Sequence, residues 1–169
     1  MNAHAMVLLL LWSGCHTLDD IPIFDGTQCA PDRVETVDCV LDGDTVQVGS
    51  CGGESVRLLG INAPEIAHEG NAAECYGSES AAWLTDLLFG QEITLRFDET
   101  CQDTYGRTLA YVYLTDPETG DITLVNEMSV REGQSVVYED FDDIKLANVL
   151  YAAQDVAQRE SVGLWGECE

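Results

Sequence analysis

Residues 34–60 read VETVDCVLDGDTVQVGSCGGESVRLLG, and their β-branched and other apolar residues are grouped between turn residues. We expect strands at Val34–Leu41, Thr45–Gly49 and Ser55–Gly60. Asp42-Gly43 is typical of a tight turn between the first two strands, and Cys51-Gly-Gly53 is typical of a turn between the second and third. The stretch therefore predicts three consecutive strands joined by short turns.

The chain beyond residue 60 predicts two further strands and three helices. Apolar residues recur at helical spacing over residues 78–88, where Ser78 or Ser80 could cap the helix and Gly90 would end it. The other elements are expected at Glu92–Phe97 and Leu109–Leu114 (strands), and at Ile122–Glu132 and about Asp142–Glu160 (helices). The order β-β-β-α-β-β-α-α predicts an α+β fold, a small five-stranded Greek-key β-barrel with three α-helices packed against it.

The composition is that of a folded but very acidic chain. Its 169 residues include 31 Asp and Glu against 7 Lys and Arg, a net charge of −24, and 46 % of them are hydrophobic. That hydrophobic share can build the core of one globular domain, which excludes a disordered acidic tail. The charge argues against a polybasic nucleic-acid binder and against docking on an anionic membrane through Lys and Arg clusters.

The strongly apolar run of the chain is Met6–Trp12, which is followed by Ser13, Gly14 and Cys15. A run of seven residues is too short for a membrane-spanning helix, which needs about 20, but it is typical of a secretory signal. Residues 11–15 resemble a bacterial lipoprotein cleavage box, in which Cys15 would carry the lipid anchor. The alternatives are a short signal without lipidation and a start codon assigned too far downstream.

These features predict an exported protein in three parts. We expect a signal peptide at residues 1–14, a tether or irregular lead-in at residues 15–32 and one domain at residues 33–169. The protein would then be secreted, periplasmic or a membrane-anchored lipoprotein of a bacterium.

Six cysteines remain when Cys15 is set aside: Cys29, Cys39, Cys51, Cys75, Cys101 and Cys168. An even number in an exported chain predicts three disulfides, for which 15 pairings are possible. Free thiols in a cytosolic protein are the alternative. The sequence has no Cys-X-X-Cys pair, so a zinc site is not expected.

Three short segments carry groups suited to catalysis: Asp42-Gly-Asp-Thr45, Arg57-Leu-Leu-Gly-Ile-Asn-Ala-Pro-Glu65 and Asp103-Thr-Tyr-Gly-Arg107. Each has an ordinary explanation when taken alone: a hairpin turn, an edge arginine with an exposed glutamate, and a solvated turn arginine. In this order and spacing they resemble the staphylococcal-nuclease-like (thermonuclease) family, over about residues 34–166. The resemblance implies an OB-fold version of the predicted barrel and hydrolysis of DNA and RNA phosphodiester bonds with Ca²⁺.

The resemblance also implies a metal site. Asp44 matches a carboxylate ligand, and the backbone carbonyl of Ala63 matches a further ligand. Asn62 stands where the best-known members have a second carboxylate. An amide oxygen can bind Ca²⁺, but the lost charge should weaken its affinity.

The remaining matched residues would handle the substrate. Glu65 matches the residue that orients or deprotonates the attacking water, while Arg57 and Arg107 match the pair that grips the phosphate. Guanidinium groups suit that task because they present a planar fork of donors and stay charged. Tyr105 and Tyr138 could stack on the bases of a single strand, although core or rim tyrosines are the alternative.

Several departures from the family pattern favour a second interpretation. The loop at residues 68–74 and position Thr104 lack the basic residues of the best-known members, and Asn62 lacks the carboxylate. The alternative function is therefore a catalytically weak or inactive OB-fold module that binds single-stranded nucleic acid or a protein partner. A purely structural lipoprotein is a third possibility. The negative charge predicts slow encounter with a polyanionic substrate at low salt, relieved as salt screens the field.

The family barrel should bring the segments around Cys75 and Cys101 close together. We therefore expect a disulfide between these two cysteines that tethers the loop of Arg107. The expected substrate is nucleic acid, preferably single-stranded. No obligate protein partner is evident, and a monomer is expected.

Overall fold

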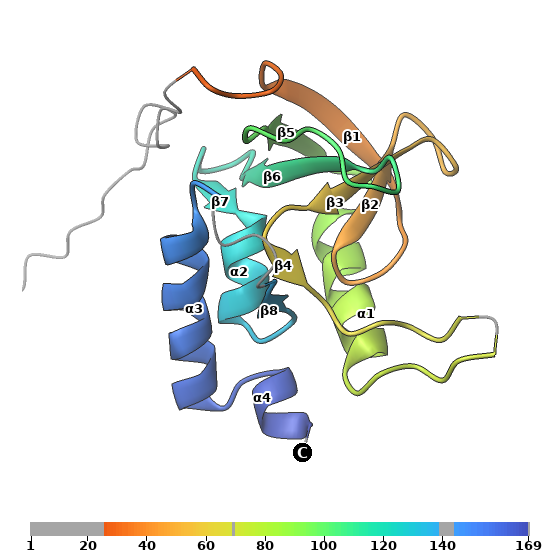
Figure 1. Cartoon of the computed structure of the whole chain (residues 1–169), viewed down its shortest axis with the longest axis vertical. Helices are drawn as coiled ribbons and strands as arrows, with labels where there is room; N and C mark the ends of the chain where they lie inside the picture. Colours follow the sequence, from red (N-terminus) through yellow and green to blue (C-terminus); the bar gives the residue numbers. More distant parts are fainter. Residues whose placement is uncertain (1–25, 69, 139–143, 169) are drawn as a thin grey trace, which may run out of the picture.

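Five strands close into a barrel (Figure 1) in the computed structural model, which describes residues 26–68, 70–138 and 144–168. The strands are β1 (Arg33–Val40), β2 (Thr45–Val48), β3 (Glu54–Leu58), β5 (Glu92–Arg96) and β6 (Thr108–Thr115). They pair antiparallel in the order β3-β2-β1-β5-β6, and a parallel pairing of β3 with β6 closes the barrel. The predicted five-stranded OB-type barrel is confirmed.

Three short strands lie outside the barrel wall. β7 (Ile122–Leu124) pairs with the end of β6, and β4 (Ile61–Asn62) pairs with β8 (Val136–Val137). β4 carries the chain directly from the end of β3 to Asn62 and Ala63.

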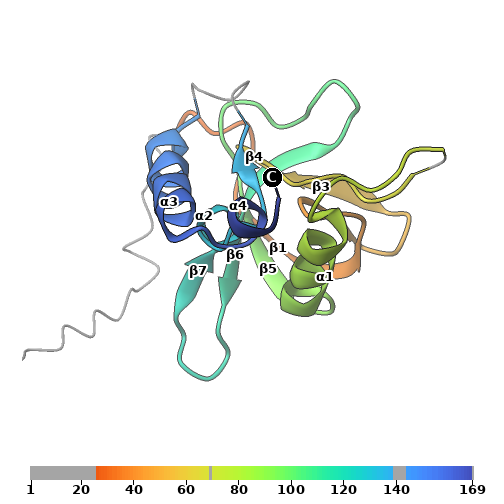
Figure 2. The same cartoon turned by 90° about the horizontal axis from the view of Figure 1, so that it is seen from below.

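Three helices and one short helical turn complete the fold. They are α1 (Gly77–Leu88), α2 (Val125–Arg131), α3 (Ala147–Glu160) and α4 (Leu164–Glu167). Helices α1 and α3 lie on opposite sides of α2 in both views (Figures 1 and 2). Within the described ranges, we find no helix with the length and apolar character needed to cross a bilayer.

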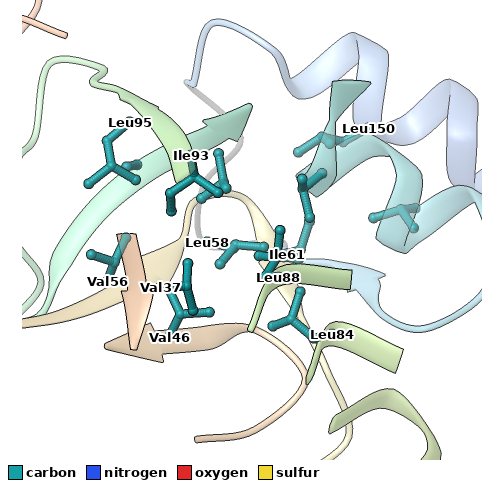
Figure 3. Close-up of a cluster of buried hydrophobic side chains, with 14 of the residues drawn as sticks. Val37, Val46, Val56, Leu58, Ile61, Leu84, Leu88, Ile93, Leu95 and Leu150 are labelled. Carbon is teal, nitrogen blue, oxygen red and sulfur yellow. The ribbon is translucent and has the colours of Figure 1, made fainter. Parts of the chain in front are cut away.

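The core fills the barrel and extends to the helices that pack on it (Figure 3). Alternate strand residues such as Val56 and Leu58 are fully buried, as expected where successive side chains point to opposite faces. Leu84 and Leu88, one turn apart on α1, join this core, and so does Leu150 of α3. Because Val56 and Leu58 of β3 point into the core, the side chain of Arg57 between them points to the other face of the sheet.

One predicted helix start and one predicted helix cap are wrong. The helix expected from Ile122 begins only at Val125, because residues 122–124 extend the sheet along β6. Helix α1 begins at Gly77 and is preceded by Tyr76 in the left-handed region, with no side-chain cap. Ser80 does not cap this helix; its hydroxyl donates to the carbonyl of Gln134.

The third helix is described from Ala147, with Leu146 at its N-cap position. The start expected near Asp142 falls outside the described residues. The predicted signal peptide and Cys15 also fall outside them.

Three disulfides are present, as predicted from the cysteine count, but the expected Cys75–Cys101 pairing is wrong. The bonds join Cys29 to Cys101, Cys39 to Cys51 and Cys75 to Cys168. The lead-in at residues 26–32 lies against the loop after β5, where the Cys29 N–H donates to the Asp98 carbonyl at 2.8 Å. Cys101 therefore bonds to the lead-in, whereas Cys75 bonds to the C-terminal segment.

Candidate active site

A surface hollow of about 420 Å³ gathers most of the residues singled out from the sequence. Those predicted residues are Arg57, Asn62, Glu65, Tyr105, Arg107 and Tyr138. They come from β3, β4, the loop after β4, the loop before β6 and the segment after β8. Segments far apart in the chain therefore meet in one place.

The parallel pairing that closes the barrel also brings the two arginines together. Arg57 is opposite Leu109 in the β3–β6 register, and Arg107 lies two residues before Leu109. Arg57 faces away from the core because its neighbours Val56 and Leu58 face into it. The hollow therefore lies directly over the seam of the barrel.

Arg57 is buried and bridges two oxygens. Its Nη1 lies 2.7 Å from Oδ2 of Asp44, and its Nη2 donates to Oδ1 of Asn62 at 3.0 Å. Burial lowers the pKa of Arg57 below its usual value, and the charge of Asp44 opposes that shift. An arginine remains protonated under such shifts, so the guanidinium is a fixed, preoriented cation.

Asp44 is also buried, and further hydrogen bonds hold its carboxylate and its backbone N–H. Oδ2 accepts the N–H of Ala63 at 2.7 Å, Oδ1 accepts the hydroxyl of Thr45 at 3.0 Å, and the N–H of Asp44 donates to Oδ1 of Asp42 at 3.0 Å. Burial raises the pKa of Asp44 to about 7 despite the opposing charge of Arg57. A carboxylate in this setting gains strongly from a neighbouring cation.

Glu65 has a fixed backbone and an exposed side chain. Its N–H donates to Oε2 of Glu74 at 3.0 Å, and its carbonyl accepts the N–H of Glu74 at 2.9 Å. A side chain at Gly77 would collide with the carbonyl of Glu65, so α1 can begin there only with glycine. Oε2 of Glu65 lies 3.3 Å from Nε2 of His68, at the solvent-facing side of the hollow.

Arg107 is held by Asp103, which was not predicted as a site residue. Oδ2 of Asp103 accepts Nε of Arg107 at 2.6 Å, and Oδ1 accepts the N–H groups of Tyr105 and Arg107. Burial alone would raise the pKa of Asp103, but these hydrogen bonds outweigh it and leave the pKa below its usual value. The position of Asp103 at the start of the Asp103–Arg107 motif was the sequence feature that could have identified it.

The two tyrosines lie at the rim of the hollow. Tyr105 is 85 % exposed, and the guanidinium of Arg107 lies 5.5 Å from the centre of its ring. Tyr138 is 37 % exposed, and its N–H donates to the carbonyl of Gly60. The hollow is also lined by residues that were not predicted: Thr100, Gln102, Asp103, Thr104 and Leu109.

The oxygen donors around Asp44 fit a hard cation such as Ca²⁺ better than a transition metal. Among the described residues there is no cluster of three or more His, Cys, Asp or Glu side chains suited to a metal ion. The candidate ligands are instead one carboxylate from Asp44, one amide oxygen from Asn62 and the backbone of Ala63. In this structure Ala63 presents its N–H to Asp44. Arg57 contacts Oδ2 of Asp44 and Oδ1 of Asn62.

A closed OB-type barrel with two arginines and a glutamate around one hollow offers the donors that binding a phosphate group requires. The chain matches the family described as staphylococcal nuclease homologue over residues 55–167, and it belongs to that family. The predicted family is confirmed.

Individual relatives agree with this assignment. The chain is 32 % identical to a thermonuclease of Staphylococcus intermedius, over 75 % of this chain and 72 % of the relative. It is 29 % identical to a thermonuclease of Staphylococcus hyicus, over 83 % and 80 % respectively. It is 35 % identical to a probable endonuclease LCL3 of Saccharomyces cerevisiae, over 65 % of this chain but only 40 % of the yeast protein. The predicted enzyme class, a nuclease hydrolase, is confirmed.

Proposed function

We propose that this chain is an exported, Ca²⁺-dependent nuclease that hydrolyses phosphodiester bonds of DNA, RNA or both by in-line attack of water. The observation that carries the proposal is the convergence of Arg57, Glu65 and Arg107 on one hollow of about 420 Å³. Membership of the staphylococcal nuclease homologue family supports it.

The two arginines would bind the phosphate and stabilise the charge that gathers on its oxygens during attack. Arg57 is oriented by Asp44, and Arg107 is oriented by Asp103, so both guanidiniums are held in place before the substrate arrives. Preorganised donors of this kind are worth about 3–4 kcal/mol each in the transition state. Loss of either arginine should therefore cost activity by orders of magnitude.

Glu65 would hold or deprotonate the attacking water. Its carboxylate is solvent-facing, while its backbone is fixed by Glu74 and by the close approach of Gly77. An ordinary glutamate is a weak base in bulk water, so its usefulness depends on this fixed position.

Asp44, Asn62 and the carbonyl of Ala63 would hold the Ca²⁺. When bound, the ion supplies positive charge at the phosphate and can hold the nucleophile. With one carboxylate and one amide, the site has less negative charge than a site with two carboxylates, which predicts weak Ca²⁺ binding.

A single strand is the substrate form that the rim favours. Tyr105 presents an open ring face beside Arg107, and Tyr138 lines the same hollow, so bases flanking the phosphate could stack there. Neither stacking contact requires a paired base. The proposed activity requires no protein partner, and a monomer is sufficient for it.

Three disulfides support export, because such bonds persist in oxidising compartments and are rare in the cytosol. The proposed destination is the cell exterior or the periplasm. A lipid anchor at Cys15 is part of the same proposal.

The test is cleavage of single-stranded DNA by the oxidised protein, with and without Ca²⁺, alongside Glu65→Gln and Arg107→Ala. Arg131→Ala is the matched control, since Arg131 is an exposed arginine of α2 that does not line the hollow. We expect each site variant to lose about 10²–10³-fold in rate and the control to keep full activity. Wild-type cleavage no faster than that of the site variants, at every Ca²⁺ and salt concentration, would refute the enzyme and favour the binding module.

A further inference from the structure

We propose that Arg57 is the resting counter-ion of the cation site, and that a divalent cation must displace it from Asp44 and Asn62. The displaced guanidinium then becomes available to the substrate phosphate. This inference rests on the proposed function, because it takes Ca²⁺ as the cation.

The geometry makes the two cations mutually exclusive. The guanidinium already contacts Oδ2 of Asp44 at 2.7 Å and Oδ1 of Asn62 at 3.0 Å. These are the two side-chain oxygens that a metal would need. Ca²⁺ binds oxygen at about 2.3–2.6 Å, so an ion on these atoms would occupy the space of the guanidinium and repel its charge.

The hydrogen bonds of Asp44 limit the positions at which a metal ion could bind alongside the guanidinium of Arg57. Oδ2 accepts both the guanidinium and the N–H of Ala63, and Oδ1 accepts the hydroxyl of Thr45. The carboxylate has few lone-pair positions left for an additional partner. An ion that binds Oδ2 of Asp44 must therefore replace the guanidinium rather than add to it.

The charge balance explains why displacement is needed in this chain. Asn62 is neutral, so Asp44 is the carboxylate in direct contact with the buried Arg57, while the charges of Asp42 and Glu65 act on Arg57 without a direct ion pair. A dication gains less from a carboxylate that is already neutralised than from one with excess negative charge. A carboxylate at position 62 would add such a charge, and the ion would then gain more from displacing the guanidinium.

Arg57 also needs a new partner once it is displaced. Its other hydrogen bond among the described residues is a long one, in which Nη1 donates to the carbonyl of Leu58 at 3.5 Å. A buried guanidinium without an anion is costly, and a phosphate oxygen in the adjacent hollow would satisfy it. One residue thus serves first as an internal cation and then as a substrate ligand.

The experiment measures Ca²⁺ affinity by calorimetry on the oxidised full chain without substrate. The variants are Arg57→Met, Asn62→Asp and, as the matched control, Arg107→Met, which removes a charge from the same hollow but from a different carboxylate. We expect Arg57→Met and Asn62→Asp each to tighten Ca²⁺ binding by about tenfold or more. Arg107→Met should change the affinity by less than about threefold, because its charge is farther from Asp44 and partly solvent-screened.

A second measurement keeps the inference testable if Arg57→Met does not fold. In the wild type, Ca²⁺ should shift the side-chain NMR resonances of Arg57, while those of Arg131 stay unchanged. An affinity of Arg57→Met no higher than that of the wild type, or an Arg57 resonance that saturating Ca²⁺ does not move, overturns the displacement. Absence of Ca²⁺ binding in all proteins, including Asn62→Asp, instead overturns the proposed metal dependence.

Discussion

The Cys29–Cys101 disulfide should stabilise the fold and also hold the Arg107 loop in place for catalysis. The bond joins residues 72 apart in sequence, and in the chain-entropy account such a link is worth about 4 kcal/mol. Replacing both cysteines by serine should therefore lower Tm by about 10–15 °C in a domain of this size. Thermal unfolding followed by circular dichroism measures this part of the effect.

The same change should lower activity at temperatures where the variant is still folded. The bond anchors the loop that follows Asp98 and carries Asp103, Tyr105 and Arg107. A displacement of a catalytic group by about 1 Å can cost about 10²-fold in rate, so we expect a loss of at least about tenfold in kcat/KM. Cleavage of a short single-stranded oligonucleotide, assayed well below both Tm values, measures it.

The Cys39–Cys51 bond provides the control. It joins residues only 12 apart in β1 and the β2–β3 turn, which predicts a loss of about 3 kcal/mol on removal. Neither cysteine adjoins a residue that lines the hollow, whereas Cys101 lies between the lining residues Thr100 and Gln102, so kcat/KM should be unchanged in that double serine variant. Equal kcat/KM for the two double variants would refute the anchoring role of Cys29–Cys101.

Three further predictions concern salt, packing and pH. Activity should rise from low to moderate NaCl, because the net charge of −24 repels a polyanionic substrate and salt screens that repulsion. The Debye length falls from ~10 Å at 0.1 M to ~3 Å at 1 M salt. A steady fall in activity with increasing NaCl would contradict this. Gly43→Ala should destabilise the fold by about 1–3 kcal/mol in urea unfolding, since its Cβ would collide with Ser80; unchanged stability would exclude that contact. Asp103→Asn should cost about 1–3 kcal/mol near pH 7. Because the pKa of Asp103 is lowered in the fold, this stability is present above the unfolded pKa of about 4 and is lost as pH falls through the folded pKa. Urea unfolding of both proteins at low and neutral pH checks it, and a gap that persists at low pH would contradict it.

Local patterns in the sequence were sufficient to predict the barrel strands. The run from Val34 to Leu41 corresponds to β1 within one residue at each end, because β-branched residues between turn residues favour strands. Residues 122–124 show the limit of such patterns. Their helical periodicity was overridden by pairing with β6, a contact between segments that no local window contains.

The site residues could be selected from motif order, but their partners could not. Convergence of Arg57 and Arg107 follows from the closure of the barrel by β3 and β6. The ion pairs with Asp44 and Asp103 are tertiary contacts that depend on exact side-chain placement. The pairing of Cys75 was mispredicted for a related reason, since cysteine spacing does not determine connectivity.

Two of the three disulfides adjoin the loops that carry the proposed catalytic residues. Cys101 lies in the loop that leads to Arg107 and bonds to Cys29. Cys75, which bonds to Cys168, follows Glu74, whose carboxylate accepts the backbone N–H of Glu65. For a chain exported as proposed, both loops would stay unanchored while the thiols are reduced in the cytosol. Hydrolysis would then be slower before oxidation than after it, so the cell that synthesises the nuclease would be partly protected from its activity.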